Sequence, residues 1–365
     1  MEFQDLIKSS FFHLPKKIDE KVSFREYIFN LLDEYLLLLS NLKNQTIHIQ
    51  GLSKPKKIST TIKIQEEFIR GLKNTINLYL DGQPYNAYEE FKKSIEYRTG
   101  KFKKILNINS FQKEESFYRI RLKQENYALS STQMFHIPFE MRGKVQTQRY
   151  SIPGFPSLYL AKTLYVGWEE LHRPSLSNFQ AVRLKNVKKI KYLDLTASNI
   201  SDNLTSDKAY KYLMTWPLIA CCSIKVNDYS DPFKPQYIIP QLLTQWIRNN
   251  QELDGIKYNS THIISNDIET VGELYNIVLP VKDNKDKGFC DHLINMFEIS
   301  ETISQQLIDF KSGGMTFLES EKEIKKISDK IPSIEFIRGS RTPYGYSILG
   351  KLERELDKMK TKKIL

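Results

Sequence analysis

Cysteine and histidine are scarce in this sequence, which has three cysteines and six histidines among 365 residues. Cys221, Cys222 and Cys290 lack the spacing of a disulfide framework or of a cysteine metal site. The histidines are too scattered for their spacing to indicate a metal centre. We therefore expect buried thiols, a reducing cytoplasm, and neither a metal ion nor a bound cofactor.

Long apolar runs are also missing. The most apolar run, residues 35–39, directly follows Asp33 and Glu34 and is far shorter than the roughly 20 residues of a membrane-spanning helix. Residues 1–5 are acidic and lack the apolar core of a signal peptide. These features predict a cytoplasmic protein that does not enter a membrane.

Several catalytic motifs are absent as well. The chain has no Gly-rich phosphate loop followed by Lys and Ser or Thr, no GxGxxG, HExxH or GxSxG motif, and no CxxC pair. The composition is that of a globular protein, with 40% hydrophobic residues and a net charge of +11. The positive charge favours a phosphate-bearing ligand, and because the lysines are scattered we do not expect nucleic acid as a partner.

Residues 1–110 have the pattern of a helical bundle. Ser23 and Glu26 form a capping box that opens a helix to about Asn41, and further helices are expected over residues 61–80 and after Pro84. The bundle offers no Arg and His at the spacing of a helical nuclease. We therefore expect it to act as a scaffold or to bind a partner.

Strands dominate from about residue 110 to residue 300. Strands are expected at residues 117–122, 157–161, 181–184, 191–195, 256–260 and 276–280, and helices at residues 206–223 and 237–249. Residues 301–365 again have a helical pattern, in which Leu352, Leu356 and Met359 share one side. The prediction is an α+β protein with a helical domain over 1–110, a catalytic domain over 111–300 and a helical C-terminal extension over 301–365.

The residues whose side chains are suited to catalysis or ligand binding lie within one stretch of the sequence. Residues 149–170 read as a loop with two prolines, a short strand and a helix capped by Thr163, and they carry Arg149, Tyr159 and Glu170. Arginine matches the geometry of pyrophosphate, tyrosine offers a flat face to a heterocycle, and a glutamate stabilises an oxocarbenium-like transition state. This combination suits the cleavage of an N-glycosidic bond in a dinucleotide.

The same segments resemble the RES domain family. The matching residues are Arg149-Tyr150-Ser151, Gly154, Leu158-Tyr159, Glu170, Gly255-Ile256-x-Tyr258-x-Ser260, Tyr118-Arg119 and Asn276, within residues 115–285. The resemblance implies an ADP-ribosyltransferase-like mixed sheet core that consumes NAD, as in toxins of bacterial toxin–antitoxin pairs. It also implies an antitoxin or regulatory protein as partner. We further expect a homo-oligomer.

The resemblance assigns a role to each matching residue. Glu170 would stabilise the positive charge that develops on the nicotinamide ribose, and Ser260 and Arg149 would complete the catalytic set. The residues that would bind NAD, the substrate, are Arg119, Tyr159, Ser151 and Asn276. Ser151 departs from the family, in which many members have Asn at this position. We expect Arg119, Arg149, Tyr159, Glu170 and Ser260 to meet in one cleft.

Alternatives remain open at the level of the sequence. Glu169 is the neighbour of Glu170 on the same helix, about 100° away, although the spacing from Tyr159 favours Glu170. The predicted function is cleavage of NAD by water or phosphate. The alternatives are an ADP-ribosyltransferase that modifies a macromolecule, and a non-catalytic protein that binds nucleic acid or a partner.

Overall fold

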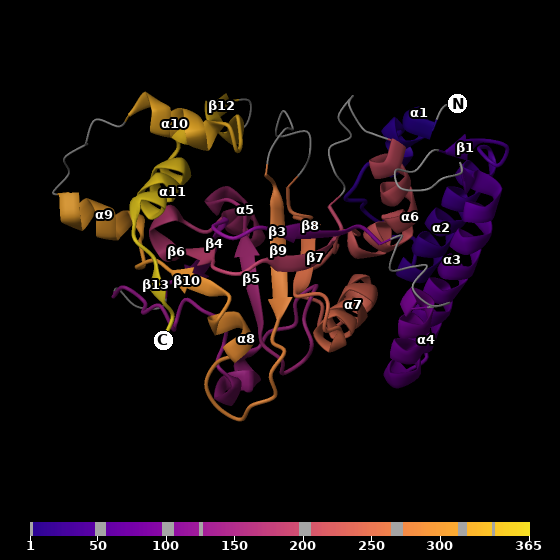
Figure 1. The fold of residues 1–365 in the computed structure, drawn as a ribbon, viewed down its shortest axis with the longest axis horizontal. Coiled ribbons are helices and arrows are strands. Elements are labelled where there is room, and N and C mark those ends of the chain that lie inside the picture. Colours follow the sequence, from indigo (N-terminus) through magenta and orange to yellow (C-terminus); the bar gives the residue numbers. More distant parts are fainter. Residues whose placement is uncertain are drawn as a thin grey trace. The chain divides into compact units, whose positions relative to one another are not determined.

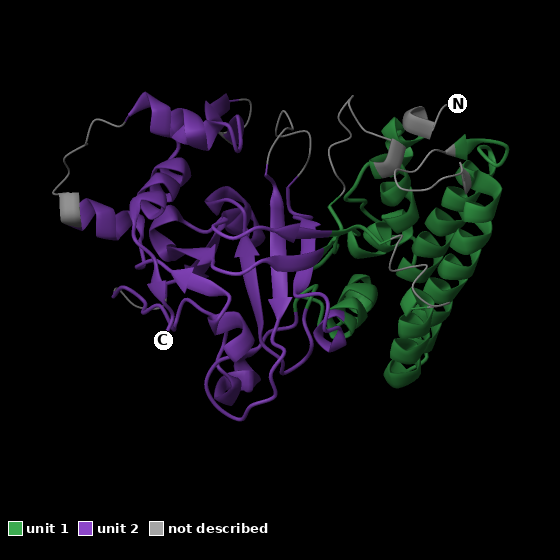
Figure 2. Ribbon diagram, viewed as in Figure 1, with its two compact units in different colours: residues 1–108, 148–150, 193–246 green, residues 109–147, 151–192, 247–365 purple. Residues whose placement is uncertain are grey.

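The computed structural model describes residues 3–47, 56–96, 106–123, 127–196, 206–263, 273–312, 320–337 and 340–365. The chain divides into two compact units (Figure 2). Unit 1 comprises residues 1–108, 148–150 and 193–246, and unit 2 comprises residues 109–147, 151–192 and 247–365. Each unit is described by itself.

Unit 1 is built mainly of helices. They are α1 (Phe3–Lys8), α2 (Phe24–Ser40), α3 (Ile58–Leu80), α4 (Pro84–Glu96), α6 (Ser206–Cys222) and most of α7 (Ile238–Asn249), with 3₁₀ turns η1 (Ser10–Phe12) and η4 (Pro235–Tyr237) and a short pair of strands, β1 (Thr46–Ile47) and β2 (Lys56–Lys57) (Figure 1). The predicted cap of α2 is confirmed, because Ser23 Oγ accepts a hydrogen bond from the backbone N–H of Glu26 at 3.2 Å.

An aromatic cluster explains why α6 belongs to the helical unit. Trp216 of α6 is fully buried and stacks on Tyr35 of α2, with ring centroids 4.9 Å apart. Phe12 packs edge-on against the same indole at 5.1 Å. The sequence analysis places this helix in the catalytic domain, and the long-range aromatic contacts place it in unit 1.

Unit 2 is organised around a large sheet. Its described strands are β3 (Ile108–Phe111), β4 (Ser116–Leu122), β5 (Ser157–Ala161), β6 (Phe179–Asn186), β7 (Ile190–Asp194), β8 (Gly255–Asn259), β9 (Tyr275–Pro280), β10 (Phe297–Ile299) and β13 (Lys362–Lys363). They lie in the order β13-β10-β6-β4-β5-β9-β8-β7-β3. From β13 to β8 each strand is antiparallel to its neighbour. The α+β class and the predicted strands are confirmed.

The two faces of the sheet carry separate cores. Phe117, Leu158 and Leu160 belong to one buried cluster, whereas Tyr118 and Ala161 belong to the other. This division follows from the alternation of side chains along a strand. The second face also receives side chains from two helices, α5 (Leu164–Glu170) and α11 (Ile348–Lys358).

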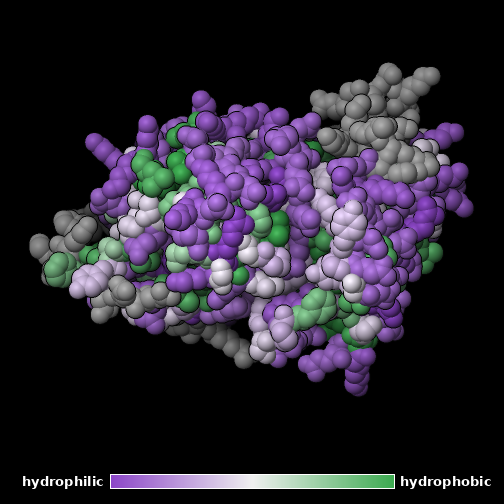
Figure 3. All heavy atoms as spheres, turned by 90° about the horizontal axis from the view of Figure 1, so that it is seen from below, coloured by the Kyte–Doolittle hydropathy of each residue, from purple (hydrophilic) through white to green (hydrophobic). Residues whose placement is uncertain are grey.

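The remaining elements of unit 2 are short. They are the helices α8 (Asp291–Ile294), α9 (Gln305–Ser312) and α10 (Glu321–Ser328), the 3₁₀ turns η2 (Phe139–Lys144), η3 (Leu176–Asn178) and η6 (Tyr344–Tyr346), and the hairpin strands β11 (Ser333–Ile337) and β12 (Ser340–Pro343). None of the helices in the described ranges combines the length and apolar content that crossing a membrane requires. On the face drawn in Figure 3, polar side chains predominate and hydrophobic ones form small scattered groups.

The C-terminal segment differs from the predicted helical extension. The β11–β12 hairpin interrupts its helices, and β13 pairs with β10 at the edge of the sheet. Leu352 and Leu356 are fully buried in the second core, and Met359 packs against it. The predicted apolar side of this segment therefore packs on the body of unit 2, and residues 301–365 are part of that unit.

Candidate functional site

The loop before β5 contains a tight turn. The N–H of Phe155 donates to the carbonyl of Ile152 at 2.9 Å, and Gly154 has φ +71°. Pro153 and Gly154 thus occupy the positions that a type II turn prefers, because its third residue needs a positive φ. Ser151 directly precedes the turn and is buried. As expected, this stretch forms neither a helix nor a central strand.

Helix α5 follows β5 and begins as predicted. Thr163 Oγ1 accepts from the backbone N–H of Val166 at 3.3 Å, which satisfies one of the open donors at the helix start. The helix ends at Glu170, so both candidate carboxylates lie in its last turn.

The two neighbouring glutamates have different environments. Glu169 is buried, and its two carboxylate oxygens accept from Nε of Arg173 at 3.1 and 3.0 Å. Glu170 keeps 29% of its side chain exposed. Its Oε1 accepts from Nδ2 of Asn276 at 2.9 Å. Glu169 is thus held in a local ion pair, and Glu170 presents its carboxylate to the face of the sheet.

A row of side chains crosses four strands on that face. Tyr118 pairs with Ala161, Ala161 with Asn276, and Asn276 with Tyr258. Residues directly opposite each other on neighbouring strands share a face. Tyr159, two residues before Ala161, therefore lies on the same face as Asn276. The structure brings this pair and Glu170 together on one side of the sheet of unit 2.

Ser260 joins this group through a histidine. It is the first residue after β8, and its Oγ accepts from the backbone N–H of His262 at 3.2 Å. Nε2 of His262 lies 3.9 Å from Oε2 of Glu170, an ion-pair distance rather than a hydrogen bond. We use the name Glu170 site for Tyr159, Glu170, Ser260, His262 and Asn276.

Two histidines, His262 in this site and His172 beside it, were not predicted from the sequence. His262 contacts His172 edge-on, with ring centroids 4.6 Å apart. Each follows a predicted site residue by two positions, since His172 follows Glu170 and His262 follows Ser260. This spacing of two residues was the sequence signal from which both histidines could have been predicted. Among the described residues, no group of three or more His, Cys, Asp and Glu side chains could hold a metal ion.

The two predicted arginines both donate to backbone carbonyls. Arg149 belongs to unit 1, where Nη1 and Nη2 donate to the carbonyls of Cys222 and Ile224 at 3.2 and 2.9 Å. Its guanidinium also lies over the ring of Tyr237, 5.1 Å from the centroid. Because Cys222 ends α6, the cation sits at the negative end of that helix. These contacts hold the Arg149 side chain within unit 1.

Arg119 leaves β4 on the other face of the sheet. It alternates with Tyr118 and therefore shares the side of Phe117. Its Nη1 donates to the carbonyl of Tyr159 at 3.0 Å, and its Nε is buried without a hydrogen-bond partner. Burial, and then the charge of Arg121, lower the pKa of Arg119 to about 10. Arg119 therefore does not lie on the face of the sheet that carries Asn276.

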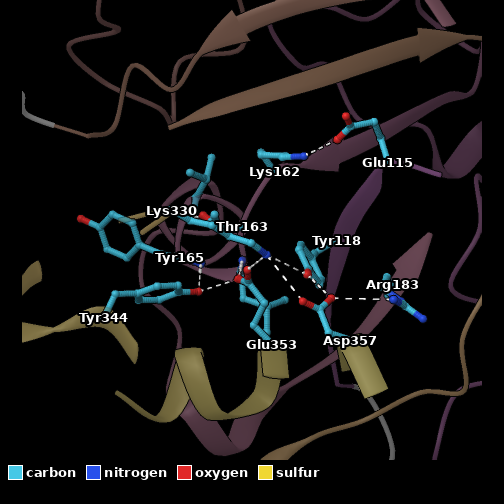
Figure 4. A network of polar contacts seen from close by, with 12 residues as sticks. Glu115, Tyr118, Lys162, Thr163, Tyr165, Arg183, Lys330, Tyr344, Glu353 and Asp357 are labelled. Atoms are coloured by element: carbon cyan, nitrogen blue, oxygen red, sulfur yellow. Dashed lines mark hydrogen bonds and ion pairs between the residues drawn. The ribbon is translucent and has the colours of Figure 1, made fainter. Parts of the chain in front are cut away.

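A buried polar network supports the start of α5 (Figure 4). Oε2 of Glu353, on α11, accepts from the backbone N–H of Leu164 at 2.9 Å and from the hydroxyl of Tyr344 at 2.7 Å. Its Oε1 accepts from Nζ of Lys330 at 2.6 Å. Burial raises the pKa of Glu353, and the neighbouring Lys330 ammonium opposes that rise. The C-terminal helix thereby fixes the helix that ends at Glu170.

A separate pocket of about 470 Å³ lies within unit 1. Lys16, Glu26 and Glu34 are among the residues that line it. Burial lowers the pKa of Lys16, while Glu34 raises it. The pocket contains no residue of the Glu170 site, whose geometry rests on hydrogen bonds and strand pairing in unit 2.

Comparison with known proteins identifies a relative over most of the chain. No family model matches the chain, and no solved structure matches it. The chain is 35% identical over 343 residues to the "Putative toxin YopC" of Bacillus subtilis (strain 168), a match that spans 89% of this chain and 73% of the relative. Two chains with this identity over most of their lengths are homologues. The chain therefore belongs to the family of this YopC protein.

Proposed function

We propose that the chain is a toxin that consumes NAD by cleaving the N-glycosidic bond to nicotinamide. Two independent lines support this. The name of its relative describes a toxin. The motif residues that resemble the RES domain family include Tyr159, Glu170, Ser260 and Asn276, which gather on one face of unit 2. The ADP-ribosyltransferase-like core belongs to the same proposal.

The observation that carries the proposal is the hydrogen bond from Asn276 to Glu170. It holds one carboxylate oxygen at 2.9 Å, and 29% of the Glu170 side chain stays exposed. A carboxylate that is held in place before the reaction stabilises developing positive charge without a cost of reorganisation. This is the requirement of an oxocarbenium-like transition state.

The chemistry follows from this arrangement. The bond between C1′ of the ribose and the nicotinamide nitrogen breaks, and its electron pair leaves with the neutral nicotinamide. Glu170 stabilises the positive charge on the ribose. Water then adds at C1′ and loses a proton to the solvent. Tyr159 offers a flat face to nicotinamide or its ribose, and the hydroxyl of Ser260 can bind a substrate oxygen.

Bond cleavage needs neither arginine in this scheme. Both Nη groups of Arg149 donate to backbone carbonyls, and Arg119 lies on the opposite face of the sheet from Asn276. Arg119 supports β5 through the carbonyl of Tyr159. Substitution of Arg119 should therefore act through the position of Tyr159.

The test is nicotinamide release from NAD by the purified full chain. Glu170→Gln keeps the size of the side chain and removes its charge, and we expect a loss of roughly 100-fold or more in the rate. Glu355→Gln is the matched control, because Glu355 is an exposed glutamate on α11 that pairs with Lys358. No release by the wild-type chain, or full activity in Glu170→Gln, would contradict the proposal.

A cellular experiment tests the toxin role. Induced expression of the wild-type chain should lower cellular NAD and stop growth, and Glu170→Gln should do neither. NAD labelled on the adenine moiety separates the two enzyme classes. Free labelled ADP-ribose supports hydrolysis. Label that remains on a macromolecule would replace the proposed activity with ADP-ribose transfer.

A further inference from the structure

The end of α5 has an unusual backbone. The N–H of His172 donates to the carbonyl of Glu169 at 3.0 Å, and the N–H of Arg173 donates to the carbonyl of Trp168 at 3.0 Å. This pair of bonds is the Schellman arrangement, in which the residue after the C-cap adopts a left-handed conformation and is usually glycine. Here that residue is His172, with φ +58°, and Arg173 follows with φ +53°.

The side chain of Arg173 has local partners that account for its position. It forms an ion pair with the buried Glu169, with Nη2 2.8 Å from Oε1, and lies 5.4 Å from the centroid of the Trp168 ring. His172 is exposed, and its ring meets His262 edge-on at 4.6 Å. The ring contact therefore joins the end of α5 to the segment that follows β8.

His262 contacts two other members of the Glu170 site, Ser260 and Glu170. Its backbone N–H donates to Ser260 Oγ at 3.2 Å, and its Nε2 lies 3.9 Å from Glu170 Oε2. Asn276 holds the other oxygen of the same carboxylate. The imidazole, from the segment after β8, and the amide, from β9, thus face the two oxygens of Glu170, and His172 packs against the imidazole.

We infer that His262 is a positioning residue for the Glu170 carboxylate, and that His172 occupies the glycine position at the end of α5 in order to hold His262. The inference rests on the proposed NAD cleavage at Glu170. A non-glycine residue with positive φ is strained, and such strain is found where surrounding contacts enforce it, often at functional sites. The contact between the two rings links this strain to the carboxylate.

The sharpest test is His172→Gly, which relieves the strain and deletes the ring. We expect the melting temperature to stay the same or rise, and kcat for nicotinamide release to fall roughly tenfold or more, because small displacements of a catalytic group are costly. KM should change little. Glu114→Gly is the matched control, since Glu114 also has a positive φ, +73°, and its exposed side chain pairs with Lys185. It should leave kcat unchanged.

Two results with these variants would overturn the inference. If His172→Gly keeps the wild-type kcat, His172 is only a helix cap. If it lowers the melting temperature, the ring serves stability. Should this variant fail to fold, His262→Asn gives the same kcat test, and its effect should be much smaller in a Glu170→Gln background than in the wild type. Additive effects in that double-mutant cycle would also overturn the inference.

A second measurement separates this inference from the proposed function. Absence of nicotinamide release by the wild-type chain would refute NAD cleavage and leave the contacts untested by kinetics. The imidazole resonances of His172 and His262 in NMR spectra then provide the test. Both should shift in Glu170→Gln and stay in place in Glu355→Gln. Unchanged resonances in Glu170→Gln would overturn the positioning role whatever the activity of the chain.

Discussion

Glu353 of α11 accepts a hydrogen bond from the backbone N–H of Leu164, the first residue of α5, at 2.9 Å. The first N–H groups of a helix have no partner within the helix, so this distant carboxylate supplies one. The residues lie 189 positions apart. Because α5 ends at Glu170, the C-terminal segment helps to hold the candidate catalytic carboxylate.

Removal of this carboxylate should strongly destabilise unit 2. Glu353→Ala leaves the ammonium of Lys330, a side chain that is only 17% exposed, without its 2.6 Å contact and the N–H of Leu164 without this acceptor, and we expect a loss of about 3–5 kcal/mol in the free energy of unfolding. Urea denaturation measures the change. Glu355→Ala, on the exposed side of α11, should stay within about 0.5 kcal/mol of the wild type. A loss below about 1 kcal/mol for Glu353→Ala would show that the network does not stabilise the fold.

Gly255 lies where β8 approaches β9 closely. A Cβ on this residue would come within 2.4 Å of the carbonyl oxygen of Val278. Gly255→Ala should therefore push the two strands apart and cost about 1–3 kcal/mol. It should also reduce any activity that depends on Asn276, which lies in β9, and on Ser260, which directly follows β8. Circular dichroism during heating measures the first effect.

Gly143 provides the control for this substitution. A Cβ there meets no atom within 4 Å, so Gly143→Ala should leave the melting temperature close to that of the wild type. Equal melting temperatures for the two variants would mean that the sheet adjusts to the extra methyl group without cost.

Much of the fold could be predicted because local signals and tertiary packing agree. The capping box at Ser23 and the apolar repeat that follows predict a helix to about Asn41, and α2 spans Phe24–Ser40. The short strand β13 could not be predicted, because Lys362 and Lys363 have no strand pattern and pair only because β10 offers an edge. The β11–β12 hairpin could not be predicted either, because it follows a segment with helical periodicity.

For the site, too, some features could be predicted from the sequence and others could not. The spacing of Tyr159 and Glu170 on a strand–helix unit was visible in the sequence, and the choice of Glu170 over Glu169 agrees with the burial of Glu169 against Arg173. The contacts of Arg149 were not visible in the sequence, because its acceptors lie 73 and 75 residues away in the chain. For Arg119, strand alternation alone separates it from Tyr118, but sequence does not say which face of the sheet carries Glu170.

The apolar side of α11 should be essential to unit 2. Leu352 is fully buried among side chains of α5 and the sheet, and Leu352→Ala should cost about 2–5 kcal/mol in urea denaturation. Ile348 begins the same helix but is 42% exposed, so Ile348→Ala should cost far less. Similar losses for both would contradict the assignment of residues 301–365 to this unit.

Acid should destabilise unit 2 through His136. This side chain is buried, its Nδ1 donates to the carbonyl of Ile137 at 2.8 Å, and its Nε2 accepts from the N–H of Cys290 at 3.0 Å, a pattern that requires the neutral ring. Burial lowers the pKa of His136 from 6.5 to about 4. Between these values the unfolded chain takes up a proton that the folded chain does not, so stability falls as the pH falls.

The expected loss between pH 7 and pH 5 is about 2 kcal/mol from this one group. His136→Gln should be less stable than the wild type at pH 7 and should lose less stability on acidification, which urea titrations at the two pH values would measure. His292→Gln removes a histidine that is 41% exposed and pairs with Asp254, and it should leave the acid-dependent loss in place. An equal loss on acidification in His136→Gln and in the wild type would mean that other groups cause the acid sensitivity.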